Sequence, residues 1–246
     1  MNDLYNRVVF ITGASSGIGR AIAINLARKK LSVVLVARRL THINNLADEI
    51  TASGGHALAV QADVTNFDEV KNAMAQAISF YGRIDIVINN AGFMAIAPLS
   101  MLKVEEWEKM VDVNIKGVLY GIAAALPLFE RQQSGHFINI ASVAGIKVLC
   151  PGGVVYSATK FAVRALSEGV RYESGKNIRT TIISPGVVES ELILGSSDAE
   201  SKKFLNEFYK QAIPAESVAN AVSYAIEQPE DVDINEIVIR PTCEDF

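Results

Sequence analysis

Short apolar segments alternate with helical patterns along the whole chain, and this alternation limits the possible folds more than any other feature of the sequence. Seven segments have the length and apolar content of buried strands, namely residues 8–12, 33–37, 57–61, 84–89, 136–141, 179–184 and 236–240. Helical patterns lie between them, for example over 17–29, 41–53 and 68–80. Strands that are apolar on both faces and joined by helices predict a parallel sheet covered on each side. We therefore expect a doubly wound α/β fold with a seven-stranded parallel sheet flanked by helices.

The chain has the length and composition of one globular domain. Its 246 residues are 50% hydrophobic and 20% charged, and they contain no internal repeat and no linker rich in Pro, Gly and Ser. We expect a single domain over 1–246, in which residues 187–213 form an amphipathic excursion that covers a binding site. The net charge of −4 gives no reason to expect nucleic acid or an anionic membrane as a partner.

The sequence also favours a cytoplasmic protein without a metal site. Its apolar runs are shorter than a membrane span, and its first residues lack the charged and apolar regions of a secretion signal. Cys150 and Cys243 are too few for a disulfide framework or a metal-ligand cluster. We expect two free thiols in a reducing compartment.

A glycine-rich turn follows the first predicted strand and precedes the first predicted helix. It reads TGASSGIG over residues 12–19, with glycines at 13, 17 and 19. Glycine permits a tight backbone turn, and the N-terminus of the following helix offers free N–H groups and a positive dipole end to an anion. The turn predicts a site for the pyrophosphate of a dinucleotide, although a turn with a purely structural role has the same composition.

Further motifs follow the glycine turn in order, each at the end of a predicted strand or in the helix after it: Asp63-Val64, NNAG at 89–92, Asn114, Ser142 after INIA, YxxxK from Tyr156 to Lys160, and Pro185-Gly186. With the pattern GxxxGxG, these motifs resemble the single-domain members of the short-chain dehydrogenase/reductase family over essentially the whole chain. The resemblance implies a Rossmann fold and an oxidoreductase that moves a hydride between a nicotinamide cofactor and a small-molecule carbonyl or secondary alcohol. It also implies a homotetramer or homodimer.

Tyr156 and Lys160 are four residues apart in a helical pattern, so their side chains share one face. A phenol titrates near pH ~10, and a neighbouring ammonium lowers its pKa, which suits proton transfer. In an isolated YxxxK pattern the two residues are more often exposed on an amphipathic helix.

The family resemblance implies a role for each of four residues. Tyr156 exchanges a proton with the substrate oxygen, while Lys160 lowers the pKa of Tyr156 and holds the ribose hydroxyls. Ser142 polarises the substrate carbonyl, and Asn114 holds a water that relays protons. Outside that context, Ser142 is a loop cap and Asn114 is the polar group of a helix distortion.

The end of the second predicted strand favours NADP(H) over NAD(H). Family members that bind NAD place an acid there to hold the adenosine ribose hydroxyls. That position is Ala37, and Arg38 and Arg39 follow it. A guanidinium can clamp a 2′-phosphate, whereas two arginines that only face water leave the missing acid unexplained. The expected cofactor-binding residues are Gly13, Ser15, Ser16, Gly17, Ile18, Gly19, Arg38, Arg39, Asp63, Val64, Asn90, Ala91, Gly92, Tyr156, Lys160, Pro185, Gly186, Val188 and Ser190.

The substrate pocket is expected to be lined by Ser142, Phe93, Met94, Leu149 and Tyr156. Its apolar members favour a substrate with a nonpolar flank. Two departures from the family pattern lie nearby: the loop from Ser142 to Tyr156 is one position longer than in many members, and Ser190 replaces a threonine that binds the nicotinamide carboxamide. The ending IVIRPT is similar to a branch of 3-hydroxy acid and alcohol dehydrogenases.

Two other functions stay open on the sequence. A 3-oxoacyl-carrier-protein reductase is a close relative and needs a basic patch near the pocket, for which the candidates are Arg131, Arg164, Arg171 and Lys176. The acidic charge balance and the different carboxyl terminus argue against it. A noncatalytic NADP(H)-binding regulator is the third function, but such proteins usually lose the tyrosine or the lysine that this chain keeps.

Overall fold

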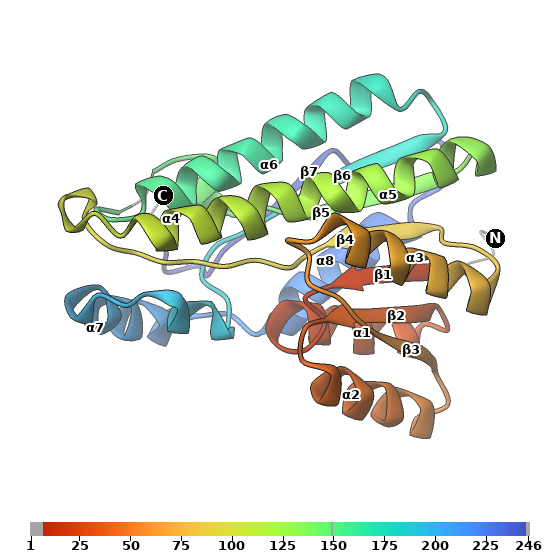
Figure 1. The fold of residues 1–246 in the computed structure, drawn as a ribbon, viewed down its shortest axis with the longest axis horizontal. Helices are drawn as coiled ribbons and strands as arrows, with labels where there is room; N and C mark the ends of the chain where they lie inside the picture. Colours follow the sequence, from red (N-terminus) through yellow and green to blue (C-terminus); the bar gives the residue numbers. More distant parts are fainter. Residues whose placement is uncertain (1–6, 149, 245–246) are drawn as a thin grey trace.

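The structure, a computed structural model, describes residues 7–148 and 150–244, in which strands and helices alternate (Figure 1). The strands are β1 (Val8–Thr12), β2 (Ser32–Ala37), β3 (His56–Gln61), β4 (Ile86–Asn89), β5 (Gly135–Ile140), β6 (Ile178–Pro185) and β7 (Glu236–Ile239). The helices are α1 (Gly17–Arg28), α2 (Leu40–Ala52), α3 (Phe67–Tyr81), α4 (Val104–Val111), α5 (Gly117–Gln132), α6 (Val154–Glu173), α7 (Ala199–Phe208) and α8 (Ala215–Glu227). Short helical turns are η1 (Leu99–Met101), η2 (Asp112–Lys116), η3 (Val143–Gly145), η4 (Glu191–Gly195) and η5 (Tyr209–Gln211).

The seven strands form one parallel sheet in the order β3-β2-β1-β4-β5-β6-β7. The predicted fold class, a doubly wound Rossmann fold, is confirmed. The strand order reverses between the neighbours β1 and β4. Ligands of such sheets bind at the carboxyl ends of the strands beside this reversal.

Helices cover both faces of the sheet, as Figure 1 shows, with α3, α5 and α6 on one side and α1, α2 and α8 on the other. Successive residues of a strand point to opposite faces. Val9 and Ile11 of β1 therefore pack with α1 and α8, while Val8 and Phe10 pack with α3 and α5. Because helices cover both faces of the sheet, every residue of β1 is buried and its first four residues are apolar.

Most predicted strands differ from the observed ones by one residue at one or both ends, and β4 differs by two. β4 begins at Ile86 rather than at residue 84, and just before it the Asp85 carboxylate accepts the backbone N–H of Val8 at 2.8 Å. The long helical stretch after β4 begins at Val104 and is interrupted by the π-helical turn η2. Asn114 lies in this turn.

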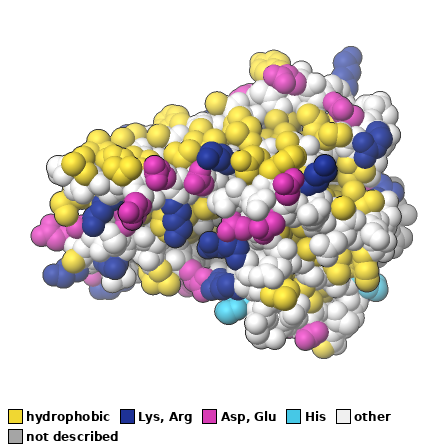
Figure 2. Space-filling model, viewed as in Figure 1, with side chains coloured by type: hydrophobic (Ala, Val, Ile, Leu, Met, Phe, Trp, Pro, Cys, Tyr) yellow, Lys and Arg dark blue, Asp and Glu magenta, His cyan; other side chains and the backbone are white. Residues whose placement is uncertain are grey.

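The continuous helical stretch Val104–Gln132 is long and apolar enough to cross a membrane by those two criteria alone. Core helices of globular domains meet the same criteria, and Ala125 and Phe129 of this stretch are fully buried. Other apolar side chains of α4 and α5, such as Val111 and Leu119, are exposed. Hydrophobic side chains gather on the outer surface over these helices (Figure 2).

Candidate functional site

A cavity of about 620 Å³ lies at the carboxyl ends of the strands. Its walls come from segments far apart in the sequence: the turns after β1, β3 and β4, the end of β2, the loop after β5 with the start of α6, and the chain from β6 to η5. This is the size of a typical small-molecule site. The topology therefore brings most of the predicted motifs to one place.

The glycines of the turn after β1 provide unusual backbone conformations and close packing. Gly13 and Gly17 have φ angles of 67° and 52°, which other residues rarely adopt. Gly19 packs directly on Gly13, because any Cβ at Gly19 would overlap the Gly13 carbonyl. The Ser16 side chain makes no capping bond to α1. The N-terminus of α1 is thus left as a place where an anion can bind.

The turn after β4 is tied to the glycine turn. Asn90 donates from Nδ2 to the Thr12 carbonyl at 2.8 Å, and the N–H groups of Asn90 and Ala91 donate to the Thr12 hydroxyl at 3.0 and 3.1 Å. A Cβ on Gly13 would lie 2.8 Å from the Ala91 Cα. Asn90, Ala91 and Gly92 line the cavity beside the glycine turn. The predicted cofactor residues of these two motifs are therefore neighbours in space.

The end of β2 brings positive charge to the cavity. Ala37 is its last residue, and Ala37, Arg38 and Arg39 all line the cavity. The Arg38 side chain is 65% exposed, and its guanidinium lies 3.7 Å from the carboxylate of Asp63. Asp63 and Val64 line the same end of the cavity. Arg38 and Asp63, both expected to contact the cofactor, are thus loosely paired.

Arg39 is bound more tightly than Arg38. Its NH2 group donates to the hydroxyls of Ser15 and Ser16, both at 2.9 Å, and to Oε2 of Glu191 at 2.7 Å. The Ser16 hydroxyl donates to the same Glu191 oxygen at 2.8 Å. Hydrogen bonds from Arg39 and Ser16 lower the pKa of Glu191. Sequence reasoning missed Glu191, whose only local signal is its place directly after Ser190.

Tyr156 and Ser142 lie together in the cavity wall, and each is 8% exposed. The Ser142 side chain is hydrogen-bonded to Tyr156 and also donates to the Pro185 carbonyl at 3.3 Å. Burial raises the pKa of Tyr156 well above its usual value, Tyr209 adds to the rise, and Ser142 opposes it. The phenol is therefore protonated at neutral pH. The direction is opposite to the lowering expected from Lys160, because burial outweighs every other effect.

Lys160 and Asn114 are also buried and lie close together. Lys160 is 5% exposed and donates from Nζ to the Ile140 carbonyl at 2.9 Å. Its Nζ lies 5.8 Å from the centre of the Tyr156 ring, and burial lowers its pKa to about 8. Asn114 accepts the N–H of Phe93 and donates to the Phe93 carbonyl, both at 2.8 Å. A Cβ built on Gly92 would be within 4 Å of both Asn114 Oδ1 and Lys160 Nζ, so both side chains lie beside Gly92.

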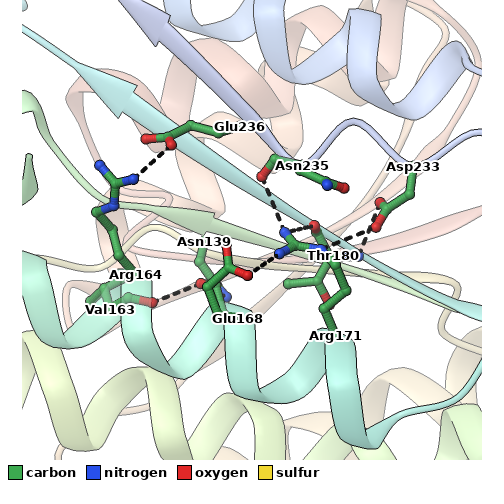
Figure 3. Close-up of polar contacts among 10 residues, drawn as sticks. Asn139, Val163, Arg164, Glu168, Arg171, Thr180, Asp233, Asn235 and Glu236 are labelled. Atoms are coloured by element: carbon green, nitrogen blue, oxygen red, sulfur yellow. Dashed lines mark hydrogen bonds and ion pairs between the residues drawn. The ribbon is translucent and has the colours of Figure 1, made fainter.

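Ion pairs hold α6, which carries Tyr156 and Lys160, against the edge of the sheet (Figure 3). Arg164 pairs with Glu236 at 2.9 Å. Arg171 pairs with Asp233 at 3.3 Å and donates to the Thr180 carbonyl at 2.7 Å. These contacts fix the carboxyl-terminal half of α6 relative to β6 and β7.

A buried chain of hydrogen bonds fixes the middle of α6. Asn89 donates to Asn139 at 2.8 Å, Asn139 donates to the Ser167 hydroxyl at 2.9 Å, and Ser167 donates to the Val163 carbonyl at 2.7 Å. All three polar side chains are 3% exposed or less. Buried polar groups are costly unless they are paired, so these hydrogen bonds favour one register of α6 on β5.

The remaining wall of the cavity is mostly apolar. Phe93 and Met94, both predicted, line it, and so does Cys150. Leu149, which was also predicted, lies outside the described residues. The excursion after β6 contributes Leu192, Leu194, Phe204, Leu205, Phe208 and Tyr209.

Two polar residues of this wall had no predicted role of their own: Tyr209 lies in the predicted excursion 187–213, and Glu244 was missed by sequence reasoning. Tyr209 is hydrogen-bonded to the Ser190 side chain, and burial raises its pKa to about 12. The Glu244 carboxylate packs directly on Gly186, because a Cβ at Gly186 would overlap it. The same carboxylate accepts the N–H of Val187 at 3.3 Å. Tyr209 had only an apolar pattern around it, and Glu244 belongs to no motif.

Comparison with known proteins agrees with this geometry. The family model of short chain dehydrogenases matches residues 7–201. The chain belongs to the short-chain dehydrogenase family. An uncharacterized oxidoreductase of Listeria innocua serovar 6a is 48% identical over 243 residues, which are 97% of this chain and 98% of that protein. As a short-chain dehydrogenase, the protein is an oxidoreductase that uses a nicotinamide cofactor.

Solved structures of other short-chain dehydrogenases superimpose closely on this one. The closed form of a serine dehydrogenase complexed with NADP⁺ is 32% identical with a TM-score of 0.87, covering 97% of this chain and 96% of that one. A short-chain dehydrogenase/reductase from Burkholderia phymatum in complex with NAD is 25% identical with a TM-score of 0.88, covering 97% and 90%. Since both cofactors occur among similar short-chain dehydrogenases, the choice between them depends on the residues of this chain.

Proposed function

We propose that this short-chain dehydrogenase transfers a hydride between NADP(H) and a carbonyl or secondary alcohol of a small molecule. The observation that carries the proposal is one cavity that contains both the buried Ser142–Tyr156 pair and the arginine-flanked glycine turn. The first can exchange a proton with a substrate oxygen, and the second can bind a phosphorylated dinucleotide.

The cavity residues fit NADP(H). The glycine turn leaves backbone space at the N-terminus of α1 for a pyrophosphate. Ala37 stands where a carboxylate would repel a 2′-phosphate, and Arg38 and Arg39 supply positive charge beside it. The cofactor, when bound, supplies or accepts the hydride. Its other proposed contacts are Gly13, Ser15, Ser16, Gly17, Ile18, Asp63, Val64, Asn90, Ala91, Gly92, Tyr156, Lys160, Pro185, Gly186, Val188 and Ser190, with Gly19 supporting the turn from behind.

In the reducing direction, Tyr156 gives the proton. As the carbonyl carbon gains a hydride, the π electrons of the C=O bond move to oxygen, and the Tyr156 hydroxyl donates its proton to that oxygen. The raised pKa keeps the phenol protonated beforehand. Ser142 donates a hydrogen bond to the same oxygen and stabilises its growing negative charge.

Lys160 returns a proton to Tyr156. With a pKa of about 8, its amine can lose and regain a proton near neutral pH. Asn114 binds both backbone groups of Phe93 and donates to the Thr159 hydroxyl at 3.0 Å. In this proposal Asn114 keeps the turn after β4 next to Lys160 and completes the path to solvent.

The structure gives less support to a carrier-protein reductase. Arg164 and Arg171, two of its four candidate basic residues, are neutralised by Glu236, Asp233 and Glu168. The apolar cavity wall fits a substrate with a nonpolar flank in either case, so the argument rests on the basic residues.

A panel of aldehydes, ketones and hydroxy acids, assayed with NADPH and NADH, tests the proposal. We expect turnover with at least one carbonyl, faster with NADPH. Tyr156→Phe should lower kcat by about 100-fold or more while NADPH binding, followed by its fluorescence, is kept. Tyr172→Phe is the matched control, since Tyr172 is on the same helix and is 87% exposed. Full activity of Tyr156→Phe, or no turnover of any carbonyl by the wild type, would contradict the proposal.

We also propose that the protein is a homodimer or homotetramer. Val104, Val111 and Leu119 of α4–α5 and Phe161 of α6 are exposed large apolar side chains, and a second copy that covers them removes this surface from water. Light scattering after size exclusion should give a mass of two or four chains; a monomer at micromolar concentration would contradict the proposal.

A further inference from the structure

The chain places one of its own carboxylates in the anion-binding end of the cavity. Glu191 accepts two hydrogen bonds from the Arg39 guanidinium, at 2.7 and 3.3 Å, and a third from the Ser16 hydroxyl at 2.8 Å. Arg39 also donates to Ser15. Arg39, Ser15 and Ser16 together form what we call the anion seat.

The anion seat has the chemistry of a phosphate site. A guanidinium binds carboxylate and phosphate oxygens with the same paired geometry. The seat stands at the N-terminus of α1, where the helix dipole also favours an anion. The segment that brings Glu191 there packs on the glycine turn, since a Cβ on Gly17 would lie 3.3 Å from the Cβ of Ser190. Glu191 thus reaches the seat from the excursion that follows β6.

We propose that Glu191 competes with the 2′-phosphate of NADP(H) for Arg39, and so acts as a specificity-determining residue. The inference rests on the proposed use of NADP(H). Two anions on one guanidinium repel each other, so a phosphate that binds Arg39 displaces Glu191 from Arg39 and Ser16. An adenosine ribose without the phosphate leaves the Glu191–Arg39 pair intact. Glu191 therefore weakens the binding of NADP(H) more than that of NAD(H).

Isothermal titration calorimetry with 2′,5′-ADP and 5′-AMP tests the competition without turnover. These probes differ only in the 2′-phosphate. Glu191→Gln keeps the length of the side chain and removes its charge. Because the side chains of Arg39 and Glu191 are 42% and 51% exposed, we expect a modest effect, with Kd for 2′,5′-ADP about two- to fivefold lower in the variant and Kd for 5′-AMP unchanged.

Glu189→Gln is the control, because it makes the same change at an exposed position two residues away; it should change neither Kd. An equal change for both probes in Glu191→Gln, or weaker binding of 2′,5′-ADP, would overturn the inference. The proposed cofactor is tested separately by the wild type. NADP(H) is supported if the wild type binds 2′,5′-ADP more tightly than 5′-AMP and if Arg38→Ala or Arg39→Ala reduces this difference in affinity. This result does not depend on the effect of Glu191→Gln. If the wild type binds 2′,5′-ADP no more tightly than 5′-AMP, the assignment of NADP(H) is contradicted, even if Glu191→Gln does bind 2′,5′-ADP more tightly.

Discussion

Replacing Lys160 with methionine tests whether the protein buries an amine without a partner charge. The Lys160 side chain is 5% exposed, and its Nζ donates to the Ile140 carbonyl at 2.9 Å. Burial alone lowers its pKa from 10.5 to about 8. Since one pKa unit corresponds to about 1.4 kcal/mol, the folded state is about 3 kcal/mol less stable below pH 8 than it would be with an unperturbed lysine.

The sign of the pH dependence follows from proton binding. Between pH 8 and 10.5 the unfolded chain holds a proton on Lys160 that the folded protein releases, so wild-type stability rises with pH in this window. Methionine does not titrate and so adds no pH dependence to the stability. It does leave the Ile140 carbonyl without its donor, at a cost of about 1 kcal/mol. We expect the wild type to gain about 2 kcal/mol relative to Lys160→Met between pH 7 and pH 10.

Urea unfolding followed by circular dichroism at pH 7, 8, 9 and 10 measures this difference. Lys176→Met is the control, because Lys176 is exposed and its replacement should give a difference that does not depend on pH. A difference for Lys160→Met that stays constant from pH 7 to pH 10 would refute the reasoning. It would mean that Lys160 keeps an ordinary pKa, and its proposed role as a proton donor near neutral pH would fail with it.

Three further substitutions test the cofactor site, the glycine turn and the buried hydrogen bonds of α6. Arg38→Asp should raise the Kd for NADPH and improve kcat/KM with NADH, and unchanged kinetics with both cofactors would contradict the assignment. Gly19→Ala should lower stability by about 1–3 kcal/mol in thermal unfolding because its Cβ overlaps the Gly13 carbonyl, whereas Gly169→Ala, in open space on α6, should not. Ser167→Ala should cost about 1–3 kcal/mol in urea unfolding because it leaves the buried Asn139 amide without its acceptor; a neutral result would show that this amide has another partner.

Much of the fold could be predicted because its signals are local. The residues of β1, predicted as 8–12, are those observed, since an apolar run between a polar start and a glycine turn marks a buried strand. The turn η2 had no signal in the hydrophobic pattern, and only the alternative role given to Asn114 anticipated a helix distortion there. It depends on the bonds of Asn114 to Phe93 and Thr159, which lie 21 and 45 residues away. A hydrophobic pattern cannot show contacts of that range.

The candidate site could also be predicted only in part. Motif spacing was enough to bring Ser142, Tyr156 and the glycine turn to one cavity, because parallel strands end at one edge of the sheet. The charge pairs within it were not predictable. Arg39 and Glu191 are 152 residues apart, and only the packing of the excursion on the glycine turn brings them together. The pKa of Tyr156 was predicted in the wrong direction, because a sequence shows which charges are present but not how deeply they are buried.

Deuterium labelling tests directly whether the hydride comes from the cofactor and whether Tyr156 assists its transfer. A carbonyl found active in the panel is reduced with NADPH that carries deuterium at both C4 positions, and the alcohol is analysed by mass spectrometry and NMR. We expect one deuterium on the carbinol carbon, a solvent proton on the oxygen, and a rate about 100-fold or more lower in Tyr156→Phe. An alcohol without deuterium, or an equal rate in Tyr156→Phe, would contradict hydride transfer assisted by Tyr156.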